Sequence, residues 1–412
     1  MIKWVRKVVK IMNLINKNTK VYYISTFLLF LASTMPHSIL TVLFLKKGLL
    51  ISQIVLMQSL FNLSMIIFEI PSGVMSDLYS RKKVYILSLL TLVITFFLII
   101  FSKSLFWLSV AYTIYGLANA LETGTIDVIL INSLKNNETG LQKFLKYQKQ
   151  ISTFSSILGS GIGFLLYFKI GVNIYFISIT LILLNIFLTA LFFSDENKKA
   201  NENINFQIFK RHIAECISEL KEKRVIKYYF IFFGIIQIFI QSHFQLWQKL
   251  FLDKGIGEKN FFVMYVLFQI IVIIAYNTNI LLINTKKLYL LLILIFLMAI
   301  TVIILKNNLI FTGIYLILCT IFFIINYYFE FHFNKILSKE KISAITSMKS
   351  FFSRIFSFGT LFISSLLLRK ISVVNLFVIN VTVVIFVVMY LIFRINKSVR
   401  QSSIKEQYQG IK

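Results

Sequence analysis

Acidic side chains inside long apolar stretches are the residues of this sequence best suited to chemistry. Glu69 lies 12 residues before Arg81, and Glu122 lies 13 residues before Lys135. In a helix rising 1.5 Å per residue, these separations place both carboxyls roughly 18 Å or more from the charged end of their segment. A carboxyl without water around it holds its proton more tightly and can exchange it near neutral pH. We expect Glu122, and Glu69 after it, to carry protons; for Glu122, a hydrogen bond between helices by the neutral acid is the alternative.

Three more charged residues lie in apolar stretches, and we expect them to meet partners. Asp127 follows Glu122 by five residues, which turns it about 140° away on a continuous helix. Asp127 should therefore face Arg81 rather than share a site with Glu122. Arg354 needs a counter-ion, and Glu330 on the preceding apolar run is the nearest candidate by sequence, so we predict a Glu330–Arg354 ion pair.

Polar side chains of two further segments could bind a solute. Gln237, Gln241 and Gln245 recur every four residues and so share one face of a helix. Such a face suits a solute with many hydrogen-bonding groups, and polar contacts between helices are the alternative. His37 could titrate near neutrality, although a lone histidine on a polar helix face is more often a packing residue. The four histidines form no HExxH pattern, and we expect no metal site.

The elements that must position these residues are helices in a membrane. Of the 412 residues, 58% are hydrophobic and 14% are charged, and the mean hydropathy is +0.82. This composition excludes an ordinary soluble protein. The formal charge of +27 would suggest nucleic acid in a polar chain, but here basic residues separate apolar runs, so we expect a lipid bilayer and no nucleic acid as partner.

A bilayer is crossed by about 20 apolar residues in a helix, and the sequence has twelve such runs. They cover approximately residues 22–45, 50–75, 84–101, 105–131, 148–168, 172–193, 228–252, 260–283, 288–305, 309–334, 342–368 and 372–393. Most of the 43 Lys and Arg fall on one side of these spans, which predicts that both termini are cytoplasmic.

The longest polar break follows the sixth span and divides the chain almost equally. We therefore predict an N-terminal six-helix bundle over 1–193, a cytoplasmic amphipathic linker over 194–227, a C-terminal six-helix bundle over 228–396 and a cytoplasmic tail over 397–412. The halves also show a weak parallel repeat, because Arg81-Lys82-Lys83-Val84-Tyr85 is followed 204 residues later by Thr285-Lys286-Lys287-Leu288-Tyr289.

One stretch is specific enough to suggest a family. Residues 69–83 read Glu-Ile-Pro-Ser-Gly-Val-Met-Ser-Asp-Leu-Tyr-Ser-Arg-Lys-Lys. Gly73, Asp77, Arg81 and Lys82 match the loop 2-3 signature of the major facilitator superfamily, G-x-L-A-D-R-x-G-R-K, with Leu78 and Ser80 departing from it. The longer pattern from Glu69 to Lys82 resembles that of bacterial drug exporters of the tetracycline-efflux and macrolide-efflux type.

The resemblance implies an all-α integral membrane fold of 12 transmembrane helices in two six-helix bundles, working by alternating access. It assigns Gly73, Asp77, Arg81 and Lys82 to a gate on the cytoplasmic side, and we expect Asp127, which should face Arg81, to belong to the same gate. Gly73 would let helices approach closely, and Asp77 would cap a neighbouring helix or pair with Arg81. Plain anchoring of the loop by positive charge is the alternative for Lys82 and Lys83.

These observations lead to one favoured function. We expect a monomer in the bacterial plasma membrane that exports a small amphipathic compound, such as an antibiotic, in exchange for protons. The proton would be the coupling ion, with no other cofactor. No nucleotide loop or nucleophile elbow occurs, so we expect no enzyme. The alternatives are transport of an endogenous metabolite, peptide or siderophore, and a membrane receptor or immunity protein that binds without transporting.

Overall fold

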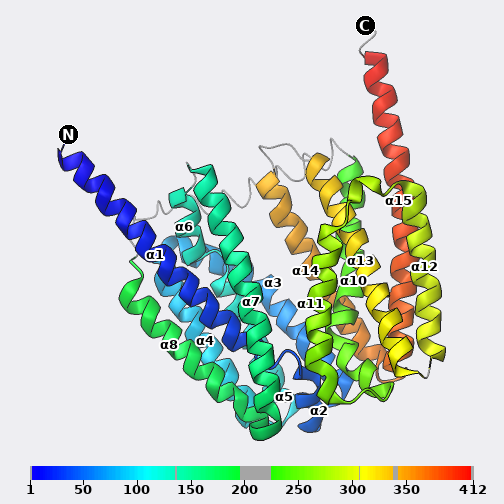
Figure 1. The fold of residues 1–412 in the computed structure, drawn as a ribbon, viewed down its shortest axis with the longest axis horizontal. Coiled ribbons are helices and arrows are strands. Elements are labelled where there is room, and N and C mark those ends of the chain that lie inside the picture. Colours follow the sequence, from blue (N-terminus) through cyan, green and yellow to red (C-terminus); the bar gives the residue numbers. More distant parts are fainter. Residues whose placement is uncertain (1, 135–136, 195–223, 306, 337–341, 410–412) are drawn as a thin grey trace. The chain divides into compact units, whose positions relative to one another are not determined.

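A computed structural model describes residues 2–134, 137–194, 224–305, 307–336 and 342–409, and every regular element in these ranges is a helix (Figure 1). The chain divides into two compact units. The N-terminal unit comprises residues 1–49 and 60–206, and the C-terminal unit comprises residues 50–59 and 207–412. The linker predicted over 194–227 falls almost wholly outside the described residues, so its amphipathic helix stays a prediction.

The first half of the chain forms helices whose lengths follow the apolar runs. They are α1 (Ile2–Thr34), α2 (Leu40–Lys46), α3 (Ile51–Leu78), α4 (Arg81–Phe101), α5 (Leu105–Glu122), α6 (Ile126–Leu134), α7 (Glu138–Ile170), the 3-10 turn η1 (Gly171–Asn173) and α8 (Ile174–Phe192). Side chains cap the first turns of several of these helices. Ser80 accepts a hydrogen bond from the backbone N–H of Lys83 at the start of α4, and Ser104 accepts one from Trp107 at the start of α5.

Two of the predicted spans are interrupted in the structure. The run over 22–45 contains the end of α1 at Thr34 and the start of α2 at Leu40, with Pro36 between them. The run over 105–131 contains the end of α5 at Glu122 and the start of α6 at Ile126. Pro36, which has no N–H to donate within a helix, lies in the first break. Gly124, at a φ of +74°, lies in the second.

The second half of the chain forms α10 (Arg224–Asp253), η2 (Glu258–Asn260), α11 (Phe261–Asn277), η3 (Ile280–Leu282), α12 (Thr285–Ile304), α13 (Asn308–Ile336), α14 (Ile342–Leu367) and α15 (Val373–Gln409). α10 and α13 are continuous where α1 and α5 stop. Residues 397–409, predicted to be a tail, continue α15 as a helix.

The internal repeat is visible in how the helices begin and pair. Asn284 caps α12 by accepting from the N–H of Lys287, as Ser80 caps α4 by accepting from that of Lys83. In the N-terminal unit, α1 packs on α7 and α8, and α4 packs on α5 and α8. In the C-terminal unit, α10 packs on α14 and α15, and α12 packs on α13 and α15. The parallel repeat suggested by the sequence therefore extends to the packing pattern.

Polar contacts and close backbone approaches hold the N-terminal unit together. A Cβ added at Gly159 or Gly163 of α7 would overlap the carbonyl groups of Leu31 or Met35 at the end of α1. The hydroxyls of Ser25 and Tyr85 lie 2.7 Å apart, and the side chain of Asn185 donates to the backbone carbonyl of Ser25 at 3.1 Å. Small residues that let helices touch, with buried hydrogen bonds across them, are the usual means of packing helices in a membrane.

Aromatic rings fill the core of the C-terminal unit. Phe239 stacks on Phe322 with ring centroids 3.7 Å apart, and Phe232 stacks on Phe329 at 3.8 Å. These pairs join α10 to α13. Such stacking adds to the burial of the rings themselves.

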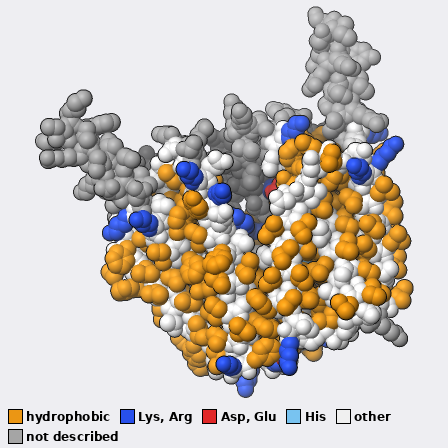
Figure 2. Space-filling view, viewed as in Figure 1, with side chains coloured by type: hydrophobic (Ala, Val, Ile, Leu, Met, Phe, Trp, Pro, Cys, Tyr) orange, Lys and Arg blue, Asp and Glu red, His pale blue; other side chains and the backbone are white. Residues whose placement is uncertain are grey.

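The described helices are long and apolar enough for a multi-pass membrane protein. Ten segments qualify as membrane spans by length and composition, and one of them, Gly140–Phe192, contains both α7 and α8. The predicted number of twelve spans is compatible with these helices and stays a prediction. Figure 2 shows apolar side chains over the flanks of the helices, with Lys and Arg gathered at the helix ends.

Candidate functional site

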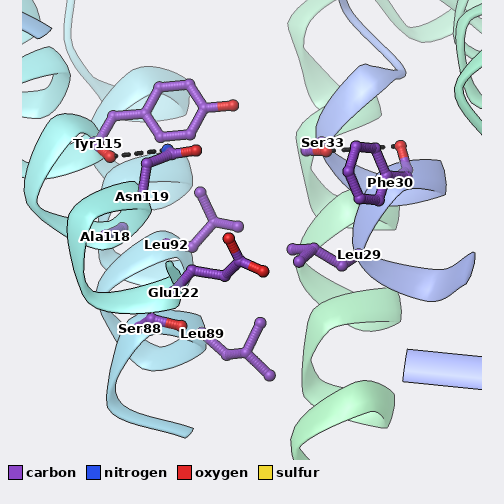
Figure 3. Close-up of a pocket in the computed structure, with 10 residues that line it drawn as sticks. All are labelled: Leu29, Phe30, Ser33, Ser88, Leu89, Leu92, Tyr115, Ala118, Asn119 and Glu122. Atoms are coloured by element: carbon purple, nitrogen blue, oxygen red, sulfur yellow. Dashed lines mark hydrogen bonds between the residues drawn. The ribbon is translucent and has the colours of Figure 1, made fainter. Parts of the chain in front are cut away.

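A cavity in the N-terminal unit is the best candidate for a functional site (Figure 3). The cavity and the open solvent at its mouth together take up about 450 Å³ of empty space. Three helices line it, with Leu29, Phe30 and Ser33 from α1, Ser88, Leu89 and Leu92 from α4, and Tyr115, Ala118, Asn119 and Glu122 from α5. Its walls are mainly apolar and aromatic, as in most small-molecule sites.

Glu122 is the charged residue of this cavity. Its side chain leaves the last turn of α5 and points across the cavity toward Leu29 of α1, with Leu92 of α4 beside it (Figure 3). Other polar groups of the wall are bonded within their own helices. Asn119 donates to the carbonyl oxygen of Tyr115 at 2.9 Å, and Ser88 donates to that of Tyr85 at 2.7 Å. The carboxyl of Glu122 is therefore the ionisable group presented to anything that enters.

The break after α5 changes the relation between Glu122 and Asp127. On a continuous helix the two would lie on different faces, and we predicted that they would not share one site. Asp127 is not among the residues that line the cavity. The two carboxylates still interact electrostatically, across the turn at Thr123-Gly124-Thr125 that precedes α6. Asp127 lies in the first turn of α6 and also interacts with the charge of Arg81. A shared role of Asp127 and Arg81 in a gate stays a prediction.

The remaining residues of the proposed gate take different places. Lys82 donates to the carbonyl oxygens of Ala190 and Phe193, each at 2.7 Å, and so caps the end of α8. This contact gives Lys82 a structural task beyond positive charge in the loop. Among the described residues, no atom lies within 4 Å of a Cβ built at Gly73, so the close helix approach expected there is not seen. The side chain of Asp77 lies outside the described part of the chain.

Glu69 does not join Glu122 in the cavity. It lies on α3, half-buried, and is not one of the residues that line the space around Glu122. Its backbone carbonyl accepts a hydrogen bond from Ser72 at 3.0 Å, in the turn that contains Pro71. A proton-carrying role for Glu69 stays a prediction.

The glutamines of α10 contact a neighbouring helix. Ser357 of α14 donates to Gln237 Oε1 at 3.1 Å and accepts from Gln241 Nε2 at 3.1 Å. These bonds favour the alternative of polar contacts between helices for these two residues. Gln245 is half-buried on the same helix, and His37 is exposed in the break between α1 and α2. Binding of a solute by Gln245 or His37 stays a prediction.

The structure pairs Glu330 with a residue that sequence reasoning missed. Glu330 Oε1 lies 3.2 Å from Lys349 Nζ, and Oε2 accepts from the hydroxyl of Tyr276 at 3.2 Å. Lys349 also lies over the ring of Phe233, 4.5 Å from its centroid. The expected partner, Arg354, lies five residues further along α14, which is about 140° around a helix. The pairing of Glu330 with Arg354 was therefore the wrong choice of partner.

His243 is a further buried titratable residue, at the centre of the C-terminal unit. Its side chain is 0% exposed. Its Nδ1 lies 3.0 Å from the hydroxyl of Tyr315 and 3.5 Å from the sulfur of Cys319. Rings of Phe239 and Phe268 enclose it. This arrangement is that of a packing histidine, and no group of three or more His, Cys, Asp or Glu that could hold a metal occurs among the described residues.

Part of the cavity wall could have been found from the sequence. Tyr115 and Asn119 precede Glu122 by seven and three residues, the spacing of one helix face. The residues from α1 and α4 carry no comparable signal. Their position depends on which helices pack together, and no local sequence pattern indicates this packing.

Taken together, two repeated helical units, an apolar cavity with one carboxylate and broken membrane helices define a membrane transporter fold. The family model described as Major Facilitator Superfamily matches residues 22–325. The chain belongs to that superfamily.

Solved structures of two transporters are similar to the whole chain. A mutant of the nucleoside transporter NupG has a TM-score of 0.72 and 14% sequence identity, covering 92% of this chain and 99% of its own. A bacterial homologue of the human lysosomal transporter Spinster, in an inward-facing and occupied conformation, has a TM-score of 0.69 and 10% identity, covering 94% and 97%. Because the sequence identities are low, these structural similarities show the fold alone. No curated protein matches the sequence.

Proposed function

We propose that the protein is a secondary transporter that exports a small amphipathic compound in exchange for protons. The observation that carries this proposal is the position of Glu122, an ionisable group in an apolar cavity between α1, α4 and α5. Because burial without water disfavours the charged carboxylate, such a group can bind a proton and release it when the surroundings change. A substrate and a proton could compete for it.

The cavity walls suit a particular kind of compound. Phe30 and Tyr115 offer aromatic surfaces, Leu29, Leu89 and Leu92 offer aliphatic ones, and Glu122 offers one negative charge. An amphipathic compound with a positive charge would contact all of these groups. The pattern from Glu69 to Lys82, which resembles that of drug exporters, supports the export direction and an antibiotic or similar xenobiotic as substrate.

The electrostatic interaction between Arg81 and Asp127 supports a gate at the start of α6. Paired charges that hold a loop against a helix end can stabilise one conformation of the transporter, and breaking the pair releases it. Alternating access would then connect the cavity with the two sides of the membrane in turn.

Transport by purified protein in proteoliposomes tests this proposal. A growth screen across classes of toxic cations and antibiotics first selects a compound whose toxicity falls on expression of the protein. With a proton gradient imposed, the wild type should move that compound against its gradient. At saturating concentration of the compound, Glu122→Gln should lose this movement yet retain exchange of labelled for unlabelled compound, because exchange needs no net proton transfer. The concentration that half-saturates this exchange should rise, because the negative charge that contacts the compound is gone.

Asp253→Asn is the matched control. Asp253 is a half-exposed carboxylate in an ion pair with Lys249 at the end of α10, so its loss should leave coupling unchanged. Binding without any movement would instead indicate a receptor. Undiminished gradient-driven movement in Glu122→Gln would show that another group carries the proton.

A further inference from the structure

The break between α5 and α6 has no equivalent in the other half of the repeat. Adding the 204-residue offset to Glu122 and Ile126 gives Asn326 and Glu330, and both lie inside the uninterrupted helix α13. A break in a membrane helix removes backbone hydrogen bonds that lipid cannot replace. Since α13 packs in the same pattern without a break, the fold itself does not require one at this point.

Specific local contacts hold the broken segment in place. Gly124 has a φ of +74°, in the left-handed region where residues with a Cβ are strained. The hydroxyl of Thr125 donates to the carbonyl oxygen of Glu122 at 2.6 Å and bridges the break. Among described residues, nothing lies within 4 Å of a Cβ built at Gly124. Backbone conformation, and not lack of space, therefore favours glycine here.

The break separates two carboxylates with different surroundings. Glu122, the last residue of α5, lines the cavity, and Asp127, in the first turn of α6, interacts with Arg81 at the start of α4. Among the described residues, Tyr22 of α1 and Tyr85 of α4 also interact electrostatically with both carboxylates, in addition to Arg81 with Asp127. The two carboxylates repel each other when both are charged, so neutralising Glu122 weakens a force that acts across the break.

We propose that the segment Thr123-Gly124-Thr125 is a joint through which Glu122 in the cavity controls the position of Asp127 against Arg81, with Gly124 as its positioning residue. This inference rests on the proposed proton-coupled transport and names the element that links its cavity to its gate. When the charge of Glu122 is lost, the repulsion across the joint falls and α6 shifts relative to α5. An alanine at Gly124 would oppose the left-handed turn and with it this movement.

Hydrogen–deuterium exchange of the full-length protein in lipid nanodiscs tests the joint without any substrate. The readout is the exchange of backbone amides in peptides from α6 (Ile126–Leu134) and from the start of α4 near Arg81. In the otherwise unaltered protein, Glu122→Gln should change exchange in both peptides several-fold. With Gly124→Ala present, the same substitution should produce no change in either.

Two further variants separate coupling from simple damage to the fold. Gly48→Ala is the matched control, because Gly48 also has a left-handed backbone, with φ of +89° and nothing within 4 Å of an added Cβ, but lies at the end of α2. The response to Glu122→Gln should persist in it. Gly124→Asn should retain much of the response, since asparagine tolerates the left-handed region. If Gly124→Ala does not fold, Thr125→Val replaces it, because that change removes the hydrogen bond across the break and should weaken the response.

Several results would contradict the proposal that this segment is a joint. They are an unchanged exchange pattern on Glu122→Gln alone, a full response in Gly124→Ala, and an equal loss of response in Gly48→Ala. These outcomes are independent of the transport assay. If Glu122→Gln loses proton-coupled transport but leaves hydrogen–deuterium exchange unchanged, the proposed function holds and the joint is excluded. If Glu122→Gln changes hydrogen–deuterium exchange as expected but transports normally, only the role of Glu122 as proton carrier is excluded.

Discussion

Lys47 and Lys254 cap corresponding helices in the two halves of the chain. Lys47 Nζ donates to the carbonyl oxygens of Ile99, Ile100 and Ser102 at the end of α4, at 2.5, 3.1 and 2.8 Å. Lys254 Nζ donates to those of Ile303 and Leu305 at the end of α12, both at 3.0 Å. Each lysine precedes a glycine in the left-handed region, Gly48 or Gly255. A cation at the carbonyl end of a helix also opposes the helix dipole.

Removal of either lysine should destabilise its unit. Lys47→Ala should cost about 1 to 3 kcal/mol, the range for hydrogen bonds to a charged group, and Lys254→Ala somewhat less because it makes fewer bonds. Thermal unfolding of the detergent-solubilised protein, followed by size-exclusion fluorescence, measures the difference. Lys169→Ala is the control, since Lys169 is an exposed lysine at the end of α7. Equal melting temperatures for all three variants and the wild type would contradict the capping role of Lys47 and Lys254.

The contribution of Lys47 should depend on pH in a defined direction. Burial lowers the pKa of Lys47 from 10.5, and the charge of Lys103 lowers it further. The unfolded chain therefore binds more protons than the folded one just below pH 10.5, so stability from this group rises with pH through that window. We expect the unfolding free energy of the wild type relative to Lys47→Met to increase there. The increase should be smaller in a Lys103→Gln background, and a decrease would show that the sign is wrong.

Much of the fold could be predicted because it depends on segment length and local caps. Apolar runs of membrane-spanning length identify helices whatever their neighbours are. The offset that relates Arg81 to Thr285 was visible in the sequence, and it recurs in the caps formed by Ser80 and Asn284. Arg81 and Asp127 lie in the first turns of α4 and α6, and their predicted association in a gate is untested by these helix positions.

The site was harder to predict, since it depends on packing and on a break inside an apolar run. Thr123-Gly124-Thr125 is compatible with a continuous membrane helix, and only tertiary structure shows that the helix stops there. The choice of Arg354 over Lys349 as partner of Glu330 failed for a related reason. Lys349 lies at the start of a span, where a lysine is usually read as an anchor at the membrane surface.

Substitution of a glycine at the contact of α7 with α1 should loosen the N-terminal unit. At Gly163 an added Cβ overlaps the backbone of Met35, so Gly163→Ala should cost about 1 to 3 kcal/mol, as overpacking usually does. Gly313→Ala is the control, because Gly313 lies in α13 with nothing within 4 Å of the added Cβ. That change should be neutral or stabilising by up to about 1 kcal/mol. Melting of the two purified variants compares them, and equal effects would exclude a tight contact at Gly163.

A double-mutant cycle should distinguish the two basic residues, Lys349 and Arg354, that could form an ion pair with Glu330. Lys349 and Glu330 have side chains 16% and 32% exposed, so solvent screens their attraction and we expect a coupling energy of about 1 kcal/mol. Melting of Glu330→Gln, Lys349→Met and the double variant gives this energy. The parallel cycle with Arg354→Met should give a coupling close to zero, because Arg354 lies on another face of α14. A larger coupling of Glu330 to Arg354 than to Lys349 would mean that the observed ion pair is not the one that stabilises the C-terminal unit.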